Sequence, residues 1–232
     1  SRASGRRLRV RPPRPLDPTA RWAIAAMAVV VLAMGGLVLH SATSSDTAAG
    51  ITDASLDRYL PPAGATLDVF DAEGALGATD TFAWTVPEGS WLRQNGSVRA
   101  TGGGLDLAIV DAGRIPVLID VKVDEARPGS GVVISERPGD RLELVVAKDG
   151  DGWQLVRTLG ADRQLVQLLP GPTSGVVIQV VRRATSVTVT FDREGDPIDV
   201  PGTPLLGTGI GLIAQGPGAT FDRFAYLPLD GG

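Results

Sequence analysis

The chain has 232 residues, of which 43% are hydrophobic and 21% charged, a composition that excludes a wholly disordered protein. It contains no cysteine, which excludes disulfide bonds, thiolate metal sites and cysteine nucleophiles. The net charge of −4 conceals an asymmetry, because residues 1–21 hold seven arginines and one acid, leaving a net charge of −10 for the rest. A basic head on an acidic body indicates contact with a membrane or with nucleic acid.

The first predicted element is a transmembrane helix over residues 22–40. The stretch from Trp22 to Leu39 carries no charged side chain, and as a helix it would span about 27 Å, close to the thickness of a bilayer core. The arginines precede this stretch, and the next one is Arg58. The positive-inside rule therefore places residues 1–21 in the cytoplasm as a basic tail and the rest of the chain outside the plasma membrane.

Two alternatives to this anchor concern cleavage and the role of the tail. Small residues at 47–49 could form a signal-peptide cleavage site, but the apolar run exceeds the usual core of about 7–15 residues, which favours an uncleaved anchor. The arginine-rich tail could contact nucleic acid, but next to a membrane segment it is typical of a topology signal that touches lipid headgroups. The lipid bilayer is therefore the first predicted partner.

A flexible linker and a β domain are predicted to follow the helix. Residues 41–66 are mostly small and polar, which is typical of a stalk. From Leu67 to Leu229 the sequence consists of short apolar runs broken by Gly, Pro and Asp. Residues 117–123 alternate between apolar and charged side chains, as a half-buried strand does. We expect about ten to twelve antiparallel strands in a two-sheet, all-β jelly-roll sandwich.

Several motifs of this domain resemble the concanavalin A-like lectin and glucanase jelly roll, in particular its bacterial laminin-G-like and 3-keto-disaccharide-hydrolase-like members. The most specific are Gly209-Ile-Gly211-Leu212 and Phe221-Asp-Arg-Phe224, which are similar to the family's two closing strands. The family spaces its two glycines more widely than this chain does. The resemblance implies the jelly-roll fold over residues 67–229, on a scaffold that serves both binding modules and glycosidases.

The candidate catalytic residues are Asp120 and Asp124. Glycosidases need two carboxylates, and the related glucanases carry theirs in a Glu-x-Asp-x-Glu pattern that is absent here. Asp120 and Asp124 share one face of a strand, with Lys122 between them. A solvated strand face is the favoured interpretation, and a hydrolase with unusual carboxylates is the alternative. The only histidine, His40, lies beside the membrane segment, so no Ser-His-Asp triad is expected in the domain.

The candidate metal and ligand residues are carboxylates in a turn and one tryptophan. Asp149 and Asp151 lie in an Asp-Gly-Asp-Gly turn that could bind calcium, although a plain hairpin turn is favoured and no other cofactor is expected. Trp84 and Trp153 are predicted to lie in the core. Trp91, between Gly89-Ser90 and Arg93, is predicted to be exposed and to bind ligand.

Together these features predict a single-pass, membrane-anchored module of the bacterial envelope that binds a glycan or an envelope protein outside the cytoplasm. One alternative is the glycoside hydrolase that would use Asp120 and Asp124. Another is a structural spacer within a membrane assembly. No nucleic-acid partner is expected, because the body of the chain is acidic.

Overall fold

The computed structural model describes residues 61–77, 82–113, 116–193, 195–202, 205 and 207–229. The chain divides into two units, Ser1–Ser55 and Leu56–Gly232, and the second holds all described residues. The predicted basic tail, the helix over residues 22–40 and most of the linker lie outside them. Within the described ranges, no helix is long and apolar enough to span a membrane.

The described part of the chain is built from strands alone. The strands are β1 (Thr66–Asp68), β2 (Gly74–Ala75), β3 (Thr85–Glu88), β4 (Trp91–Gln94), β5 (Ser97–Ala100), β6 (Leu105–Asp111), β7 (Val117–Glu125), β8 (Gly131–Arg137), β9 (Asp140–Val146), β10 (Trp153–Leu159), β11 (Asp162–Leu169), β12 (Val176–Arg182), β13 (Ser186–Phe191), β14 (Ile198–Pro201), β15 (Gly209–Gln215) and β16 (Thr220–Pro228).

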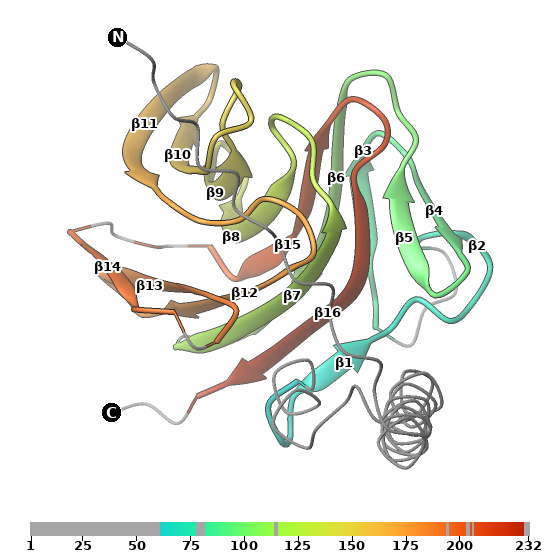
Figure 1. Cartoon of the computed structure of the whole chain (residues 1–232), viewed down its shortest axis with the longest axis horizontal. Coiled ribbons are helices and arrows are strands. Elements are labelled where there is room, and N and C mark those ends of the chain that lie inside the picture. The colour runs from blue at the N-terminus through green and yellow to red at the C-terminus, as the bar shows by residue number, and fades with distance from the viewer. Residues whose placement is uncertain are drawn as a thin grey trace, which may run out of the picture. The chain divides into compact units, whose positions relative to one another are not determined.

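These strands form two antiparallel sheets packed face to face (Figure 1). One sheet has nine strands in the order β14-β13-β12-β7-β16-β5-β4-β2, with β1 paired to β16. The other has seven strands in the order β11-β10-β9-β8-β15-β6-β3. Local hairpins build β8 to β11, whereas β15 joins this hairpin array to β6. The predicted all-β, two-sheet antiparallel sandwich is therefore confirmed.

The longer strands agree with the sequence pattern, and the short ones were missed. The alternating run at 117–123 lies in β7, whose four valine and isoleucine side chains are buried between the sheets. Strands of two to four residues, such as β2 and β14, are too short to show an alternating pattern. The predicted count of about ten to twelve strands was consequently low.

The predicted core tryptophans are confirmed. Trp84 and Trp153 are both buried, and each donates its indole N–H, to Asp68 Oδ2 and to the Pro172 carbonyl respectively, at 2.8 Å. Trp153 also stacks on Phe191, with ring centroids 5.8 Å apart. Burial of these rings removes large apolar areas from water and supplies much of the cohesion between the sheets.

A buried arginine ties the two sheets together near the candidate site. Arg182 of β12 is fully buried and donates to the carbonyls of Ile134, on β8, and of Gly207, just before β15. Burial lowers the pKa of Arg182 to about 10, because the charged guanidinium has lost its water. Gly207 is thereby fixed beside the hollow described next.

Candidate functional site

The outer face of the seven-stranded sheet, the one turned away from the other sheet, carries the candidate site. The sheet is strongly twisted and bent, with β9, β10 and β11 on one side and β6 and β3 on the other (Figure 1). The strand register places one residue from each strand in a row across this face. The row comprises Leu165, Val156, Glu143, Val133, Gly211, Ile109 and Thr85.

This outer face is apolar, although it does not face the other sheet. A second hydrophobic cluster lies along it, separate from the core, and consists of Leu107, Ile109, Val133, Val145, Val156 and Ile213. The solvent face of an antiparallel sheet is ordinarily polar. An apolar floor on a bent sheet is instead typical of a surface that receives a ligand.

A hollow of about 550 Å³, here called the rim hollow, opens at one end of this face. Tyr226 and Phe82 form an aromatic wall, with ring centroids 5.6 Å apart in an edge-to-face arrangement. Both rings are half-buried, so each keeps part of its surface open. Most of the remaining lining is polar or small and includes Thr85, Asp111, Glu136, Arg137, Thr208 and Gly209.

Two carboxylates flank Gly209 in the rim hollow. In the register, Gly209 of β15 lies opposite Asp111 of β6 on one side and opposite Glu136 of β8 on the other. The two acidic residues are therefore two strand spacings apart, or about 10 Å between Cα atoms. A Cβ at Gly209 would come within 2.8 Å of Glu136 Oε2, so the Glu136 side chain leans over the glycine.

The Asp111 carboxylate is held in its ionised form. Hydrogen bonds from the Thr208 side chain and from Gly113 N, the latter 2.9 Å long, lower the pKa of Asp111 below its ordinary value. Each bond stabilises the charged form and therefore disfavours protonation. At neutral pH Asp111 is thus a hydrogen-bond acceptor at the mouth of the hollow, and Arg137 on the opposite wall is a donor.

The hairpin that carries Glu136 and Arg137 is fixed by Asp140. Arg157 Nε and Nη2 both donate to the Asp140 carboxylate at 3.0 Å, and Arg137 Nη2 donates to it at 3.2 Å. The hydrogen bond with Arg157 is the main reason that the pKa of Asp140 is lowered, and burial opposes it. This ion pair holds one wall of the rim hollow in place.

We expect Asp140→Asn to remove part of the acid sensitivity of folding. A carboxylate with a lowered folded-state pKa contributes stability above its unfolded pKa of about 3.9, and loses it as pH falls through the folded value. The parent should therefore be more stable than the variant at pH 7. This difference should shrink as pH drops below about 4. Urea midpoints of both proteins across this range test the expectation, and a difference independent of pH would contradict it.

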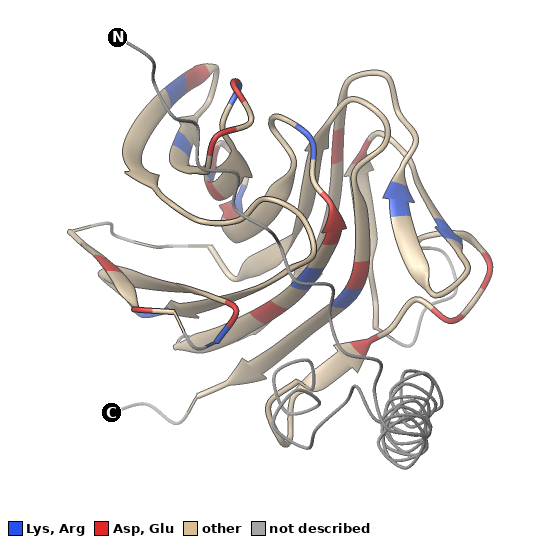
Figure 2. Ribbon diagram, in the orientation of Figure 1, with Lys and Arg blue, Asp and Glu red and all other residues tan. Residues whose placement is uncertain are grey.

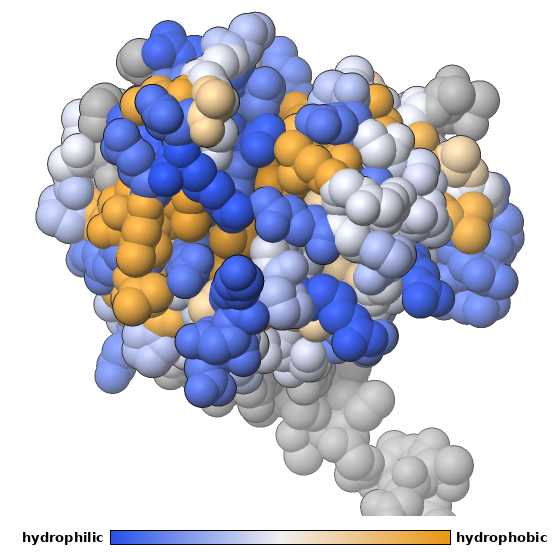
Figure 3. Space-filling view, turned by 90° about the horizontal axis from the view of Figure 1, so that it is seen from above, coloured by the Kyte–Doolittle hydropathy of each residue, from blue (hydrophilic) through white to orange (hydrophobic). Residues whose placement is uncertain are grey.

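A second hollow of about 610 Å³, here called the basic hollow, lies at the other end of the outer face. Its floor is formed by Val145, Val156 and Leu165, and its polar lining by Lys148, Gln154, Arg163 and Gln215. No Asp or Glu lines it among the residues that the structure describes. Seen from above, the molecule shows apolar clusters separated by strongly hydrophilic side chains (Figure 3).

A buried carboxylate holds Arg163 of the basic hollow and a second arginine, Arg141, on the outer face. Glu143 lies in the row across the sheet and is only 1% exposed. It accepts hydrogen bonds from Arg141 Nε at 2.6 Å, Arg163 Nη2 at 3.3 Å and Thr158 Oγ1 at 3.3 Å. Two arginines against one glutamate leave the cluster with a net positive charge.

The structure corrects the interpretation of Asp120 as part of a solvated strand face. Asp120 is 1% exposed and accepts from Arg193 Nη2 at 2.6 Å, Arg223 Nη2 at 2.8 Å and Gln179 Nε2 at 2.9 Å. These partners come from neighbouring strands and from the turn after β13, and they cover the carboxylate. Asp120 therefore offers no free carboxylate to a substrate.

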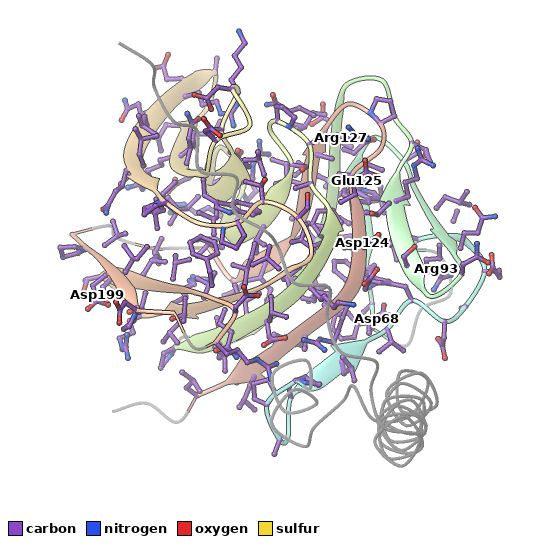
Figure 4. The ribbon with its side chains drawn as sticks, viewed as in Figure 1. Asp68, Arg93, Asp124, Glu125, Arg127 and Asp199 are labelled. Carbon is purple, nitrogen blue, oxygen red and sulfur yellow. The ribbon has the colours of Figure 1, made fainter. Side chains whose placement is uncertain are left out.

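Asp124 does not form a catalytic pair with Asp120. It is exposed at the end of β7, near Glu125 and Arg127 (Figure 4), and accepts from Thr220 Oγ1 at 3.3 Å. At the rise of a strand, four residues separate the two Cα atoms by about 13 Å, beyond the usual carboxylate spacing of about 5–9.5 Å. Between them, Lys122 pairs with Asp222 at 2.6 Å, one of several charges on β7 and β16 (Figure 2).

The prediction that Trp91 is exposed was wrong. Its side chain lies on the inner face of β4, only 2% exposed, and its ring packs on Phe221 with centroids 5.9 Å apart. The polar and small neighbours in the sequence drew attention to this position, but alternation along β4 turns Trp91 inward and Leu92 outward. A buried ring cannot stack on a ligand, so Trp91 is part of the core.

The Asp149–Asp151 segment forms the predicted hairpin turn between β9 and β10. Gly150 adopts a positive φ of 84°, and Asp149 Oδ1 accepts from Asp151 N at 3.1 Å within the turn. Within the described ranges, no group of three or more His, Cys, Asp or Glu side chains could hold a metal ion.

Sequence reasoning missed the residues that line both hollows. Asp111, Glu136, Arg163 and Tyr226 were not among the candidate residues. Their strands meet only in the folded sheet, so no local spacing reveals them. The one available signal was Gly209-Ile-Gly211, because glycines inside a strand often mark a position where a neighbouring backbone or side chain lies very close.

Comparisons with known proteins find similar solved structures and no matching family. No family model and no curated protein matches the chain. The solved structures of the GH43 protein BlXynB from Bacillus licheniformis and of Bacteroides ovatus xyloglucan PUL GH43B both have a TM-score of 0.51, at 15% and 17% identity. Each alignment covers 70% of this chain and 39% of the other protein, so the chain spans about two fifths of their length.

A third similar structure is the carbohydrate binding module CBM66 from Bacillus subtilis. Its TM-score is 0.47 at 10% identity, with 60% of this chain and 91% of that chain covered. At such identities the two GH43 structures show a shared fold and nothing finer. They agree with the concanavalin A-like resemblance at the level of the two-sheet sandwich.

Proposed function

We propose that this chain is a glycan-binding module whose primary site is the rim hollow. One observation carries the proposal: the hollow combines an aromatic wall, Tyr226 and Phe82, with the charged side chains of Asp111, Glu136 and Arg137. Sugars present apolar C–H faces and a rim of hydroxyl groups. An aromatic surface with nearby acceptors and donors complements both features.

The geometry supports entry of a chain-like ligand. At the rim hollow, two glycines let β15 lie close against its neighbours: a Cβ at Gly211 would collide with the Ala108 carbonyl of β6, and one at Gly209 would come within 2.8 Å of Glu136 Oε2. From there the apolar outer face leads across the sheet towards the basic hollow. An extended glycan could therefore contact several subsites, which is a common way to build affinity from weak contacts.

The proposal includes a membrane tether. The uncharged stretch 22–40 would anchor the chain in the plasma membrane, with the sandwich outside the cytoplasm and residues 41–66 as a stalk. This arrangement would present the rim hollow to envelope or extracellular glycans. An envelope protein as ligand, or a role as a spacer in a membrane assembly, are the competing outcomes of the test below.

We expect Tyr226→Ala and Glu136→Gln each to weaken glycan binding at least about tenfold, equivalent to about 1.4 kcal/mol. The first change removes the aromatic wall, and the second removes a charged acceptor with little effect on packing. Asp199→Asn, an exposed carboxylate on the nine-stranded sheet, is the matched control and should leave affinity unchanged. The measurement is calorimetric titration of the full chain with oligosaccharides selected on a glycan array.

Two results would contradict the proposal. The first is an array with no saturable hit for a folded parent protein, which would favour a protein ligand or a spacer role. The second is a hit whose affinity is the same for the parent, for Glu136→Gln and for Tyr226→Ala. Circular dichroism of each variant separates loss of binding from loss of fold.

A further inference from the structure

The basic hollow has the features of a separate subsite, distinct from the rim hollow in charge and lining. It carries two cationic side chains, Lys148 and Arg163, and none of the described residues that line it is acidic. The rim hollow has the opposite balance, with Asp111 and Glu136 against Arg137. The outer face therefore has an acidic end and a basic end, on a chain whose residues after the tail carry a net charge of −10.

Arg163 is both oriented and available. Glu143, buried in the apolar row, accepts from Arg163 Nη2 at 3.3 Å and so directs the guanidinium along the outer face. The Arg163 side chain remains 39% exposed, and a guanidinium has five N–H donors in a planar fork. Its other donors can therefore reach a ligand, in a geometry that matches a carboxylate.

The burial of the Glu143 carboxylate costs folding free energy, which suggests that its role is to hold Arg163 in position. A carboxylate among Val133, Val145 and Val156 loses its hydration, and apolar side chains of similar size often stabilise a fold as well or better. Its partner Arg141 shares the carboxylate, with Nε 2.6 Å from Oε1. Of these two arginines only Arg163 lines the basic hollow, whereas Arg141 lies opposite Glu136 in the strand register.

We propose that the basic hollow binds the carboxylate of an acidic sugar, so that the ligand of this module is a uronic-acid-containing glycan. This inference rests on the proposed glycan-binding function and specifies its ligand class. Arg163 would bind the carboxylate through its guanidinium, Lys148 would add a second positive charge, and Gln154 and Gln215 would contact hydroxyl groups. The apolar floor of Val156 and Leu165 would receive the C–H face of the sugar ring.

The test compares polyuronates with their own neutral forms. The full chain is titrated with a panel of oligouronates, each paired with the same oligosaccharide after its carboxyl groups are reduced to alcohols. We expect the acidic form of at least one pair to bind at least about tenfold more tightly, and added salt to remove most of this preference. Arg163→Gln should abolish the preference for the acidic form, because the guanidinium that binds the carboxylate is gone.

Matched variants separate a local from a general charge effect. Lys148→Gln should reduce the preference in part, whereas Arg183→Gln, an exposed arginine in the turn between β12 and β13, should leave it intact. Equal binding of the acidic and neutral forms, with no effect of Arg163→Gln, would overturn the inference and leave glycan binding in place. Absence of binding to either form and to every glycan tested would overturn the proposed function itself. An equal loss in all three variants would show that net charge alone attracts the polymer, which also overturns the subsite.

Discussion

Asp120→Ala should destabilise the fold by about 3–5 kcal/mol, because it leaves two guanidinium groups without their shared counter-ion. In the folded protein the Asp120 carboxylate accepts from Arg193 and Arg223, and Arg223 is itself largely buried. An intact buried ion network often stabilises a fold no more than apolar residues of the same size would. Removing one partner from it nevertheless lowers stability strongly, because the remaining charges stay buried without a counter-ion. The expected readout is a lower urea midpoint at an unchanged slope.

The control for this prediction lies on the same strand. Asp124→Ala removes an exposed carboxylate that accepts a hydrogen bond from the Thr220 hydroxyl, and we expect a change in stability within about 0.5 kcal/mol. If the two variants had equal, small effects, the described ion network would not hold Asp120 in place. The interpretation of β7 as a solvated face would then return.

Trp91→Ala should likewise cost about 3–5 kcal/mol of stability. The ring fills the space between β4 and the Phe221 side chain, and truncation leaves a cavity that the surrounding strands can only partly close. Binding of any glycan by the fraction that stays folded should be unaffected. A loss of stability with unchanged affinity is the outcome expected of a core residue. If Trp91 bound ligand, as the sequence indicated, the substitution would instead reduce affinity and leave stability unchanged.

Trp91→Phe provides the matching control. Trp91 Nε1 has no hydrogen-bond partner within the described part of the structure, so losing the indole N–H carries little cost. A phenyl ring retains most of the buried volume, and we expect a loss below about 1.5 kcal/mol. An alanine variant no less stable than the phenylalanine variant would show that the ring is not packed as described.

Most of the fold could be predicted from the sequence, because strands and hairpin turns are encoded by residues that are close together in the chain. Alternation along residues 117–123 identified β7 and assigned its valine and isoleucine side chains to the core. The Asp-Gly turn at 149–150 identified the β9–β10 hairpin. Two-residue periodicity says only that the two faces of a strand differ, and it does not say what covers the polar face. Asp120 illustrates this limit, since Arg193 and Arg223 lie 73 and 103 residues away in the sequence.

The candidate site was less accessible because it depends on which strands become neighbours. Asp111 and Glu136 share a hollow only because β15, which arrives near the end of the chain, inserts between β6 and β8. The same insertion completes the apolar row on the outer face. A pattern search along the chain therefore favoured Asp120 and Asp124, which are close in sequence, over carboxylates that are close in space.

The two hollows make the two ends of the proposed binding face chemically different. An acidic end with aromatic rings and a basic end with Arg163 are joined by an apolar floor on one sheet. A ligand bound along this floor would have to place neutral, hydroxyl-rich rings at one end and a negative charge at the other. Such polarity would discriminate among glycans by the position of their acidic residues as well as by their number.

The most direct test of this account is a crystal structure of the chain soaked with the tightest-binding oligosaccharide from the glycan array. We predict sugar density on the outer face of the seven-stranded sheet, with a ring against Tyr226 and hydroxyl groups within hydrogen-bond distance of Asp111 or Glu136. Density confined to the nine-stranded sheet or to the loops, with the rim hollow empty, would contradict the central claim.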